Sequence, residues 1–388
     1  MNSGIICKND KTKDLVSLKS NFILKKIISL MKRNKSLEIM KYNKKLQKRL
    51  NISINDYREC SELFSKIEIE LKIADNGYGK FINIPDNEKE YYHIYFDNSK
   101  EETKGNYLQK SEKVKTIKII IDYQVKSFEK LFYYCSCINS ISFNKFCRNN
   151  INDMSNMFRG CLALKELNLS KFNTNNITNM NSMFYQCLSL EELNLTNFNT
   201  INVIDMSYMF YGCSLLKHLN LSNFNTNKVT DMRFMFSGCS LLNELNLQKF
   251  NTDNIISMNS MFYGCSSLKE LNLTNFNTNK VIDMSWMFYG CSSLEELNLS
   301  NFYTNKVTNM SNMFCSCSLL KKLNLSNFNT KNTTNMDGMF EWCSSLKELT
   351  LSNFNIIDVP NKRCMFYGCS NELKNKIKEI NKDIYIEY

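Results

Sequence analysis

The apolar positions of the chain recur with a period of 26 residues over most of its length. Cysteine marks this period without insertion, at Cys135, Cys161, Cys187, Cys213, Cys239, Cys265, Cys291, Cys317, Cys343 and Cys369. Each repeat also contains the pattern L-x-x-L-x-L, in which one residue separates the last two leucines, as at Leu193 and Leu195. This alternation predicts a short strand whose leucines face inward and whose intervening residues face solvent.

A second apolar pattern lies in the other half of each repeat. Met154, Met157, Phe158 and Cys161 are spaced at i, i+3, i+4 and i+7, which is typical of one face of a helix. A residue that can cap a helix, usually Asp or Asn, precedes this stripe, and a glycine stands before the cysteine in several repeats. The sequence therefore predicts one strand and one short helical turn per repeat.

Such a unit cannot bury its apolar face alone, so neighbouring units must stack. We predict an α/β solenoid of the leucine-rich-repeat class with ten 26-residue coils, whose parallel strands lie about 4.8 Å apart. The periodic cysteines then become small buried hydrophobic residues of a protein in a reducing compartment. The predicted structural core cysteines are Cys161, Cys187, Cys213, Cys239, Cys265, Cys291, Cys317 and Cys343.

The segments on either side of the repeats have different patterns. Alternating apolar residues predict strands at Ile67–Ile73, 79–84, 91–96 and Thr116–Ile121, and the NGYG turn at 76–79 suits a hairpin. The polar stretch 371–382 predicts a capping helix. We therefore expect a basic helical segment at 1–60, a small β-rich capping domain at 61–130, the solenoid at 131–370 and a C-terminal cap at 371–388.

The net positive charge of the chain lies in its N-terminal part. Residues 1–58 contain 15 Lys and Arg against four acidic residues, so their net charge of +11 equals that of the whole chain. Such a segment can bind an acidic partner, RNA or an anionic membrane surface, or can be the solvated face of a small helical domain. We favour the last interpretation, and expect no nucleic-acid partner and no membrane span.

The repeat unit NLSNFNT…VTDMS…MFYGCSSLKEL resembles the BspA-like leucine-rich repeats of surface proteins from bacteria and anaerobic protists, over residues 131–370. The resemblance implies an adhesion and protein-binding scaffold rather than an enzyme. Residues 15–58, which include ILKKIISLM and SLEIMKYNKKLQKRL, resemble the F-box, a three-helix motif that docks on a Skp-type ubiquitin-ligase adaptor. Because neither a secretory signal peptide nor an anchor is recognisable, we expect a cytoplasmic protein, with the cell surface as the alternative.

The sequence contains no convergent set of catalytic residues. The two histidines, His93 and His218, lie in unrelated regions, and the acidic residues of the repeats are periodic rather than clustered. We therefore expect no enzyme activity, no metal and no cofactor, and predict a scaffold or recognition protein that binds another protein. The alternatives are an F-box-type substrate receptor of a ubiquitin ligase and a cell-surface adhesion protein.

The predicted binding surface is the concave face formed by the strands. Glutamates repeat there at strand spacing and repel one another, which favours a basic partner, while pairing with Lys165 and Lys269 would relieve part of the repulsion. The predicted partner-binding residues are Glu166, Asn168, Glu192, Asn194, Asn220, Glu244, Asn246, Glu270, Asn272, Glu296 and Asn298.

Overall fold

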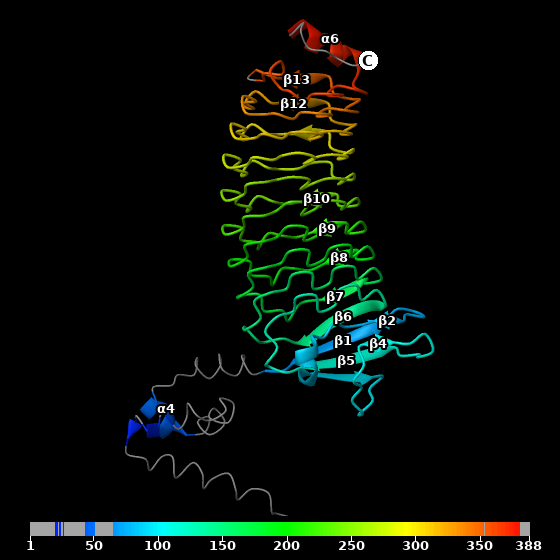
Figure 1. The fold of residues 1–388 in the computed structure, drawn as a ribbon, viewed down its shortest axis with the longest axis vertical. Helices are drawn as coiled ribbons and strands as arrows, with labels where there is room; N and C mark the ends of the chain where they lie inside the picture. Colours follow the sequence, from blue (N-terminus) through cyan, green and yellow to red (C-terminus); the bar gives the residue numbers. More distant parts are fainter. Residues whose placement is uncertain are drawn as a thin grey trace, which may run out of the picture. The chain divides into compact units, whose positions relative to one another are not determined.

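A computed structural model (Figure 1) describes residues 20, 21, 23, 24, 26, 43–50, 65–352 and 354–380 of the chain. The chain divides into two compact units, residues 1–66 and residues 67–388. In the first unit, helix α4 (Lys44–Leu50) follows Asn43, whose side-chain oxygen accepts a hydrogen bond from the Leu46 amide at 3.2 Å. The F-box-like motif expected at 15–58 lies mostly outside the described residues.

The second unit contains a solenoid of the predicted α/β leucine-rich-repeat class, with coils of about 26 residues stacked along one axis (Figure 1). Short parallel strands form one side of the coils. Parallel pairing joins β6 to β7, β8 to β9, β9 to β10, β11 to β12 and β12 to β13. Their bounds are β6 (Ile138–Lys145), β7 (Glu166–Asn168), β8 (Glu192–Leu193), β9 (His218–Leu219), β10 (Glu244–Leu245), β11 (Glu296–Leu297), β12 (Lys322–Asn324) and β13 (Glu348–Thr350).

The solenoid has about eight coils rather than the predicted ten. The first and last repeats are absorbed into the flanking elements. The strand after Cys135 is β6, which belongs to a five-stranded sheet together with strands from the preceding segment. After Cys369 the chain forms helix α6 (Asn371–Ile380) instead of a further strand. The helix expected at 371–382 is thus present over its described part.

The other half of each coil is a run of tight turns, which we call the turn segment and which comprises residues 154–161 and their equivalents. It is not the predicted α-helical turn. The Cys161 amide donates to Phe158 O within the coil at 3.1 Å, but the Gly160 amide donates to Tyr185 O of the next coil at 2.7 Å. Left-handed backbone at Gly160, with φ of 72°, turns this peptide group toward the neighbouring coil, so hydrogen bonds join the coils.

The core of the solenoid lies between the strands and the turn segments. The stripe of Met, Phe and Cys side chains from the turn segments is buried, together with the inward leucines of the strands. Phenylalanines of successive coils stack face to face, as Phe184 and Phe210 do with ring centroids 5.6 Å apart. Each coil therefore obtains much of its core from its neighbours, as expected of a one-dimensional stack.

The segment before the first coil is β-rich and shares a sheet with the coils. The sheet order is β3-β5-β1-β6-β7, so the sheet runs from this segment into the strands of the first repeats. The new strands are β1 (Ile67–Ile73), β2 (Gly79–Lys80), β3 (Tyr92–Phe96), β4 (Tyr107–Leu108) and β5 (Thr116–Ile121). The four-part division of the chain at residues 60, 130 and 370 stays a prediction.

The hairpin expected around the NGYG turn does not form between β1 and β2. Strand β1 pairs in antiparallel fashion with β5 on one side and with β6 on the other, and β2 pairs with β4. Alternate residues of β1, β5 and β6 are buried, so the three strands cover one apolar face together and leave β1 no free edge for β2. Within the described parts of the chain, no helix is long and apolar enough to cross a membrane.

Candidate functional site

The exposed residues of the short strands form one continuous surface, which we call the strand face. The inward leucines beneath it are buried, as Leu193 and Leu245 are at 7 % exposure. One row of the strand face consists of Glu166, Glu192, His218, Glu244, Glu270, Glu296, Lys322 and Glu348, all exposed. The neighbouring row consists of Asn168, Asn194, Asn220, Asn246, Asn272, Asn298 and Asn324, also exposed. All the predicted partner-binding residues therefore lie on this one face.

Parallel strand pairing holds two parts of the glutamate row in register, from Glu192 to Glu244 and from Glu296 to Glu348. Glu192 lies beside His218, and His218 beside Glu244, so an imidazole side chain separates two carboxylates there. Glu244, Glu270 and Glu296 then follow in three successive coils without an interposed base. At the far end, Lys322 pairs with Glu348 at 2.9 Å. The negative charge of the row is thus concentrated in its middle.

The relief of repulsion expected from Lys165 and Lys269 is not seen in the part of the chain that the structure describes. The ion pairs instead lie in the next column of exposed residues. Lys217 contacts Glu191 at 3.1 Å, and Lys321 contacts Glu295 at 2.6 Å. Among the described residues, the central carboxylates of the strand face therefore have no salt-bridge partner and remain available to a ligand.

The asparagine row has a structural task that the sequence analysis did not identify. The side-chain oxygen of Asn168 accepts a hydrogen bond from the Ser170 amide at 3.1 Å, and that of Asn194 accepts one from the Thr196 amide at 3.0 Å. This local turn ends each strand. The repeated N-L-S and N-L-T sequences are the signal for it, because Asn and a following small hydroxyl residue favour such turns.

Two shallow hollows interrupt the strand face. One, of about 500 Å³, is lined by residues 243–246, Gln248, Lys269, Glu270 and Asn272. The other, of about 650 Å³, is lined by side chains from the coils of Glu270, Glu296, Lys322 and Glu348. Both hollows are open and lined mainly by polar residues, unlike the enclosed apolar pockets that bind most small molecules. No group of His, Cys, Asp and Glu suited to a metal ion occurs among the described residues.

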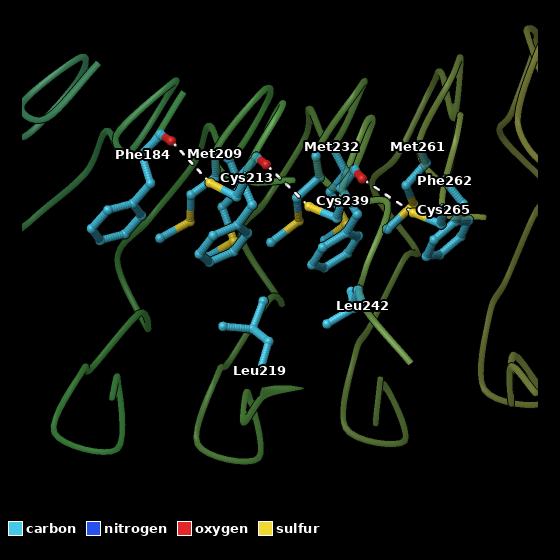
Figure 2. Close-up of a cluster of buried hydrophobic side chains, with 14 of the residues drawn as sticks. Phe184, Met209, Cys213, Leu219, Met232, Cys239, Leu242, Met261, Phe262 and Cys265 are labelled. Atoms are coloured by element: carbon cyan, nitrogen blue, oxygen red, sulfur yellow. Dashed lines mark hydrogen bonds between the residues drawn. The ribbon is translucent and has the colours of Figure 1, made fainter. Parts of the chain in front are cut away.

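The turn segments contain the predicted core cysteines, which are buried free thiols. Each thiol donates a hydrogen bond to the phenylalanine carbonyl of the preceding coil, at 3.1 Å from Cys213 to Phe184 O and from Cys239 to Phe210 O. Figure 2 shows these bonds, and the equivalent bond of Cys265, in successive coils. The cysteines are therefore inter-coil donors as well as small apolar side chains, a role that the sequence analysis missed.

Burial also determines the chemistry of these thiols. It raises the pKa of Cys213 and of Cys291 to about 12, well above the ordinary value near 9. A protonated thiol can donate a hydrogen bond, and it is a poor nucleophile and a poor metal ligand. The arrangement therefore favours a structural role for the cysteines over a catalytic one.

A half-buried aromatic column runs along the outer edge of the turn segments. Tyr185 and Tyr211 stack with centroids 4.5 Å apart, and the Arg159 guanidinium lies 4.0 Å from the centre of the Tyr185 ring. Tyr263 and Tyr289 repeat the stacking at 4.7 Å. The sequence signal is an aromatic residue two positions before the periodic cysteine, which the analysis of the apolar stripe passed over.

One family model matches three successive parts of the chain, in agreement with its repeat character. The model of one family, described as "Mycoplasma protein of unknown function, DUF285", matches residues 126–226, 215–297 and 290–384. Among solved structures, the chain is similar to a leucine-rich repeat protein from Bacteroides ovatus, with 16% identity, 69% of this chain and 88% of that chain covered, and a TM-score of 0.21. A search of curated proteins finds no match.

The family matches begin at residue 126, so they give no support to the F-box-like expectation for residues 15–58. They extend to residue 384 and together cover about two thirds of the sequence, including the whole strand face and all the turn segments. The chain therefore belongs to the DUF285 family of repeat proteins.

Proposed function

We propose that the chain is a non-enzymatic scaffold that binds a protein partner through the strand face of its solenoid. The observation that supports this most directly is the row of exposed carboxylates at equivalent positions of successive coils, of which Glu244, Glu270 and Glu296 are successive members. The surrounding surface consists of exposed Asn, Ser, Thr and Gln side chains, which suit specific hydrogen bonding.

The size of the strand face favours a macromolecular ligand. From Glu166 to Glu348 the row passes through seven coil steps, which at strand spacing gives a length of about 34 Å. A ribbon of this length, several side chains wide, approaches the area of about 800 Å² per partner that a typical specific protein interface buries. The shallow hollows accommodate protruding side chains better than they enclose a small molecule.

The charge distribution favours a partner with basic side chains. Lys or Arg placed between the central carboxylates would remove the repulsion between like charges in adjacent coils. Such contacts at the exposed rim of an interface mainly accelerate association and select the partner, rather than supply most of the affinity. The affinity would then be sensitive to salt, because exposed charges are screened within about 8 Å at physiological ionic strength.

The test is a charge-neutralising variant of the full chain with Glu192, Glu244, Glu270 and Glu296 changed together to Gln. The partner is first captured from an extract of the source cells with the immobilised wild-type chain, then purified and titrated against each variant. The matched control neutralises four exposed glutamates outside the strand face. These control positions are Glu101, Glu112, Glu129 and Glu372.

We expect the strand-face variant to bind the partner more weakly and with little salt dependence, and the control to bind as the wild type does. Equal affinity of both variants would contradict a strand-face site. A loss of binding on substitution of the aromatic column, with the strand-face variant unaffected, would place the site on the turn segments instead.

A further inference from the structure

The corner of the coil between the turn segment and the strand carries an extra leucine in four successive coils. The periodic cysteine starts the sequences CLAL, CLSL, CSLL and CSLL there, and CSSL in each of the next two coils. The last leucine of each sequence belongs to the core, so these four coils add one leucine at one of two adjacent positions. We call the added residues the leucine ridge, which consists of Leu162, Leu188, Leu215 and Leu241.

The side chains of the leucine ridge are exposed. Leu162 is 40 % exposed and Leu215 is 39 % exposed, whereas the core residue Leu216 is fully buried. A single exposed leucine is ordinary on a protein surface. Four in successive coils, about 4.8 Å apart, form an apolar strip about 14 Å long. Continuous exposed apolar surface of this kind is typical of an interaction site.

Hydrogen bonds between coils hold this corner in place. The Ser189 hydroxyl donates to Leu162 O at 2.7 Å, and the Leu241 amide donates to Ser214 O at 3.2 Å. The leucine ridge is therefore a preformed surface. A ligand that binds it need not order the backbone, so little conformational entropy of the chain is lost on binding.

The leucine ridge lies beside the glutamate row of the strand face. Leu188 precedes Glu192 by four residues, and Leu241 precedes Glu244 by three. At about 3.3 Å per residue, the Cα atoms of each pair are at most about 13 Å apart. An α-helix with its side chains is about 10–12 Å in diameter, so one helix placed on this corner can contact both the leucines and the glutamates.

The corner has a negative net charge. A column of exposed residues separates the leucine ridge from the glutamate row, and in it Lys217 pairs with Glu191 at 3.1 Å. Across the four coils, the column and the row contain four glutamates and two lysines, a net charge of −2 with His218 neutral. Negative charge disfavours nucleic acid and anionic lipid as ligands, and favours a ligand that carries Lys or Arg.

We propose that the leucine ridge and the neighbouring glutamates bind an amphipathic helical segment of the protein partner. Its apolar side chains pack on the ridge, and its Lys or Arg side chains lie over the glutamates. This inference rests on the strand-face function proposed above and specifies the chemistry of the partner. The ridge supplies affinity through buried apolar surface, while the exposed charges mainly accelerate association.

The probe is a synthetic amphipathic helix with Leu on one face and Lys on the other. About 14 residues suffice, because such a helix spans about 21 Å. Its binding to the full chain is measured by fluorescence anisotropy. In the ridge variant all four leucines of the ridge are changed to Ser, which stands at both equivalent positions in the coils of Cys265 and Cys291.

The matched control removes exposed apolar side chains from the corner that precedes the turn segment. It changes Ile204, Ile256 and Ile282, all exposed, to the Thr found at the equivalent positions 178, 230 and 308. Both variants thus carry residues that the same fold accepts in other coils, and circular dichroism should show wild-type folding for each.

We expect the Leu/Lys helix to bind the wild type and the isoleucine control equally, and the ridge variant at least about tenfold more weakly. A helix with Glu in place of Lys should bind the wild type at least about tenfold more weakly. Equal binding to the ridge variant and the wild type, or no binding to the wild type, would overturn the proposal. A wild-type dimer that becomes a monomer in the ridge variant would also overturn it, because a second copy would then cover the ridge.

Kinetics with the captured partner separate this inference from the strand-face proposal. The ridge variant should release the partner faster at an unchanged association rate, whereas the variant with four glutamates changed to Gln should mainly associate more slowly. Unchanged release from the ridge variant, with weaker binding by the Gln variant, would refute the ridge alone. Wild-type binding by both variants would refute the strand-face function as well.

Discussion

The turn segments and the strand face of the same coils follow opposite rules. In the turn segments the same Met, Phe and Cys recur from coil to coil, and Met235, Phe236 and Cys239 are fully buried. On the strand face, His218 and Lys322 replace glutamate in the exposed row while the strands keep their register. The difference indicates that the turn segments determine the fold, and that the strand face can change its charge without changing the fold.

The largest expected effect that distinguishes the turn segments from the strand face is a loss of stability at alkaline pH. The buried thiols of Cys213 and Cys291 have their pKa raised to about 12, whereas the thiols of the unfolded chain ionise near pH 8.5–9. Because the folded form keeps protons that the unfolded chain loses, this stability is complete below about pH 9 and is lost as the pH rises toward about 12. Each such thiol would lower the free energy of unfolding by up to roughly 2 kcal/mol by pH 10.5.

Urea unfolding at pH 8, 9.5 and 10.5 measures this loss by circular dichroism. Cys213→Ala is the matched variant, since it removes one buried thiol, and it should show a smaller loss of stability over the same pH range than the wild type. A stability that stays constant to pH 10.5 would mean that the thiols are more accessible than the structure indicates.

The substitution Met235→Asp tests the turn segments at a single position. Met235 is fully buried, and an unpaired carboxylate at such a site should lower the stability by more than about 4 kcal/mol. The damage should extend to both neighbouring coils, because each coil completes the core of the next. Asn246→Asp, on the strand face of the same coil, is the control and should change stability by less than about 0.5 kcal/mol. Thermal melting compares the two, and equal melting temperatures would reverse the assignment of inside and outside.

The hydrogen bonds that the buried thiols donate to the preceding coil can be tested separately from the rest of the core. Cys239→Ala removes the hydrogen bond to Phe210 O and the sulfur volume, and should lower the stability by about 1–2 kcal/mol. Cys239→Ser keeps a donor at the same place and should lie between the wild type and the Ala variant in urea unfolding. If Ser destabilises more than Ala, the cysteine acts only as an apolar side chain and the hydrogen bond is unimportant.

The strand face should show the smallest effect on stability. Changing Glu192, Glu244, Glu270 and Glu296 together to Gln removes repulsion between like charges, so we expect a change within about 1 kcal/mol, toward greater stability. Leu245→Ala, one residue from Glu244 but 7 % exposed, should instead cost about 2–4 kcal/mol. A large loss of stability in the Gln variant would show that the carboxylates hold the fold, which the account excludes.

The features that follow from the 26-residue period could be predicted from the sequence, whereas the hydrogen bonds between neighbouring coils could not. The solenoid, the inward leucines and the exposed glutamate row all follow from residue spacing in one repeat. The hydrogen bond from the Cys213 thiol to Phe184 O joins residues 29 positions apart, so no local pattern reveals it. The prediction of a helical turn was wrong for the same reason. The i, i+3, i+4 spacing identifies an apolar stripe, but it does not show that the backbone at Gly160 is left-handed or that the Gly160 amide donates to the next coil.

Carboxyl footprinting of the complex tests the central claim most directly. The chain is labelled at exposed Asp and Glu side chains with and without its captured partner, and modification is read at each residue by mass spectrometry. The account predicts that labelling of Glu244, Glu270 and Glu296 falls severalfold in the complex, while Asp253 and Glu372, exposed elsewhere, label as in the free chain. Unchanged labelling of the three strand-face glutamates in a saturated complex would contradict the claim that this face binds the partner.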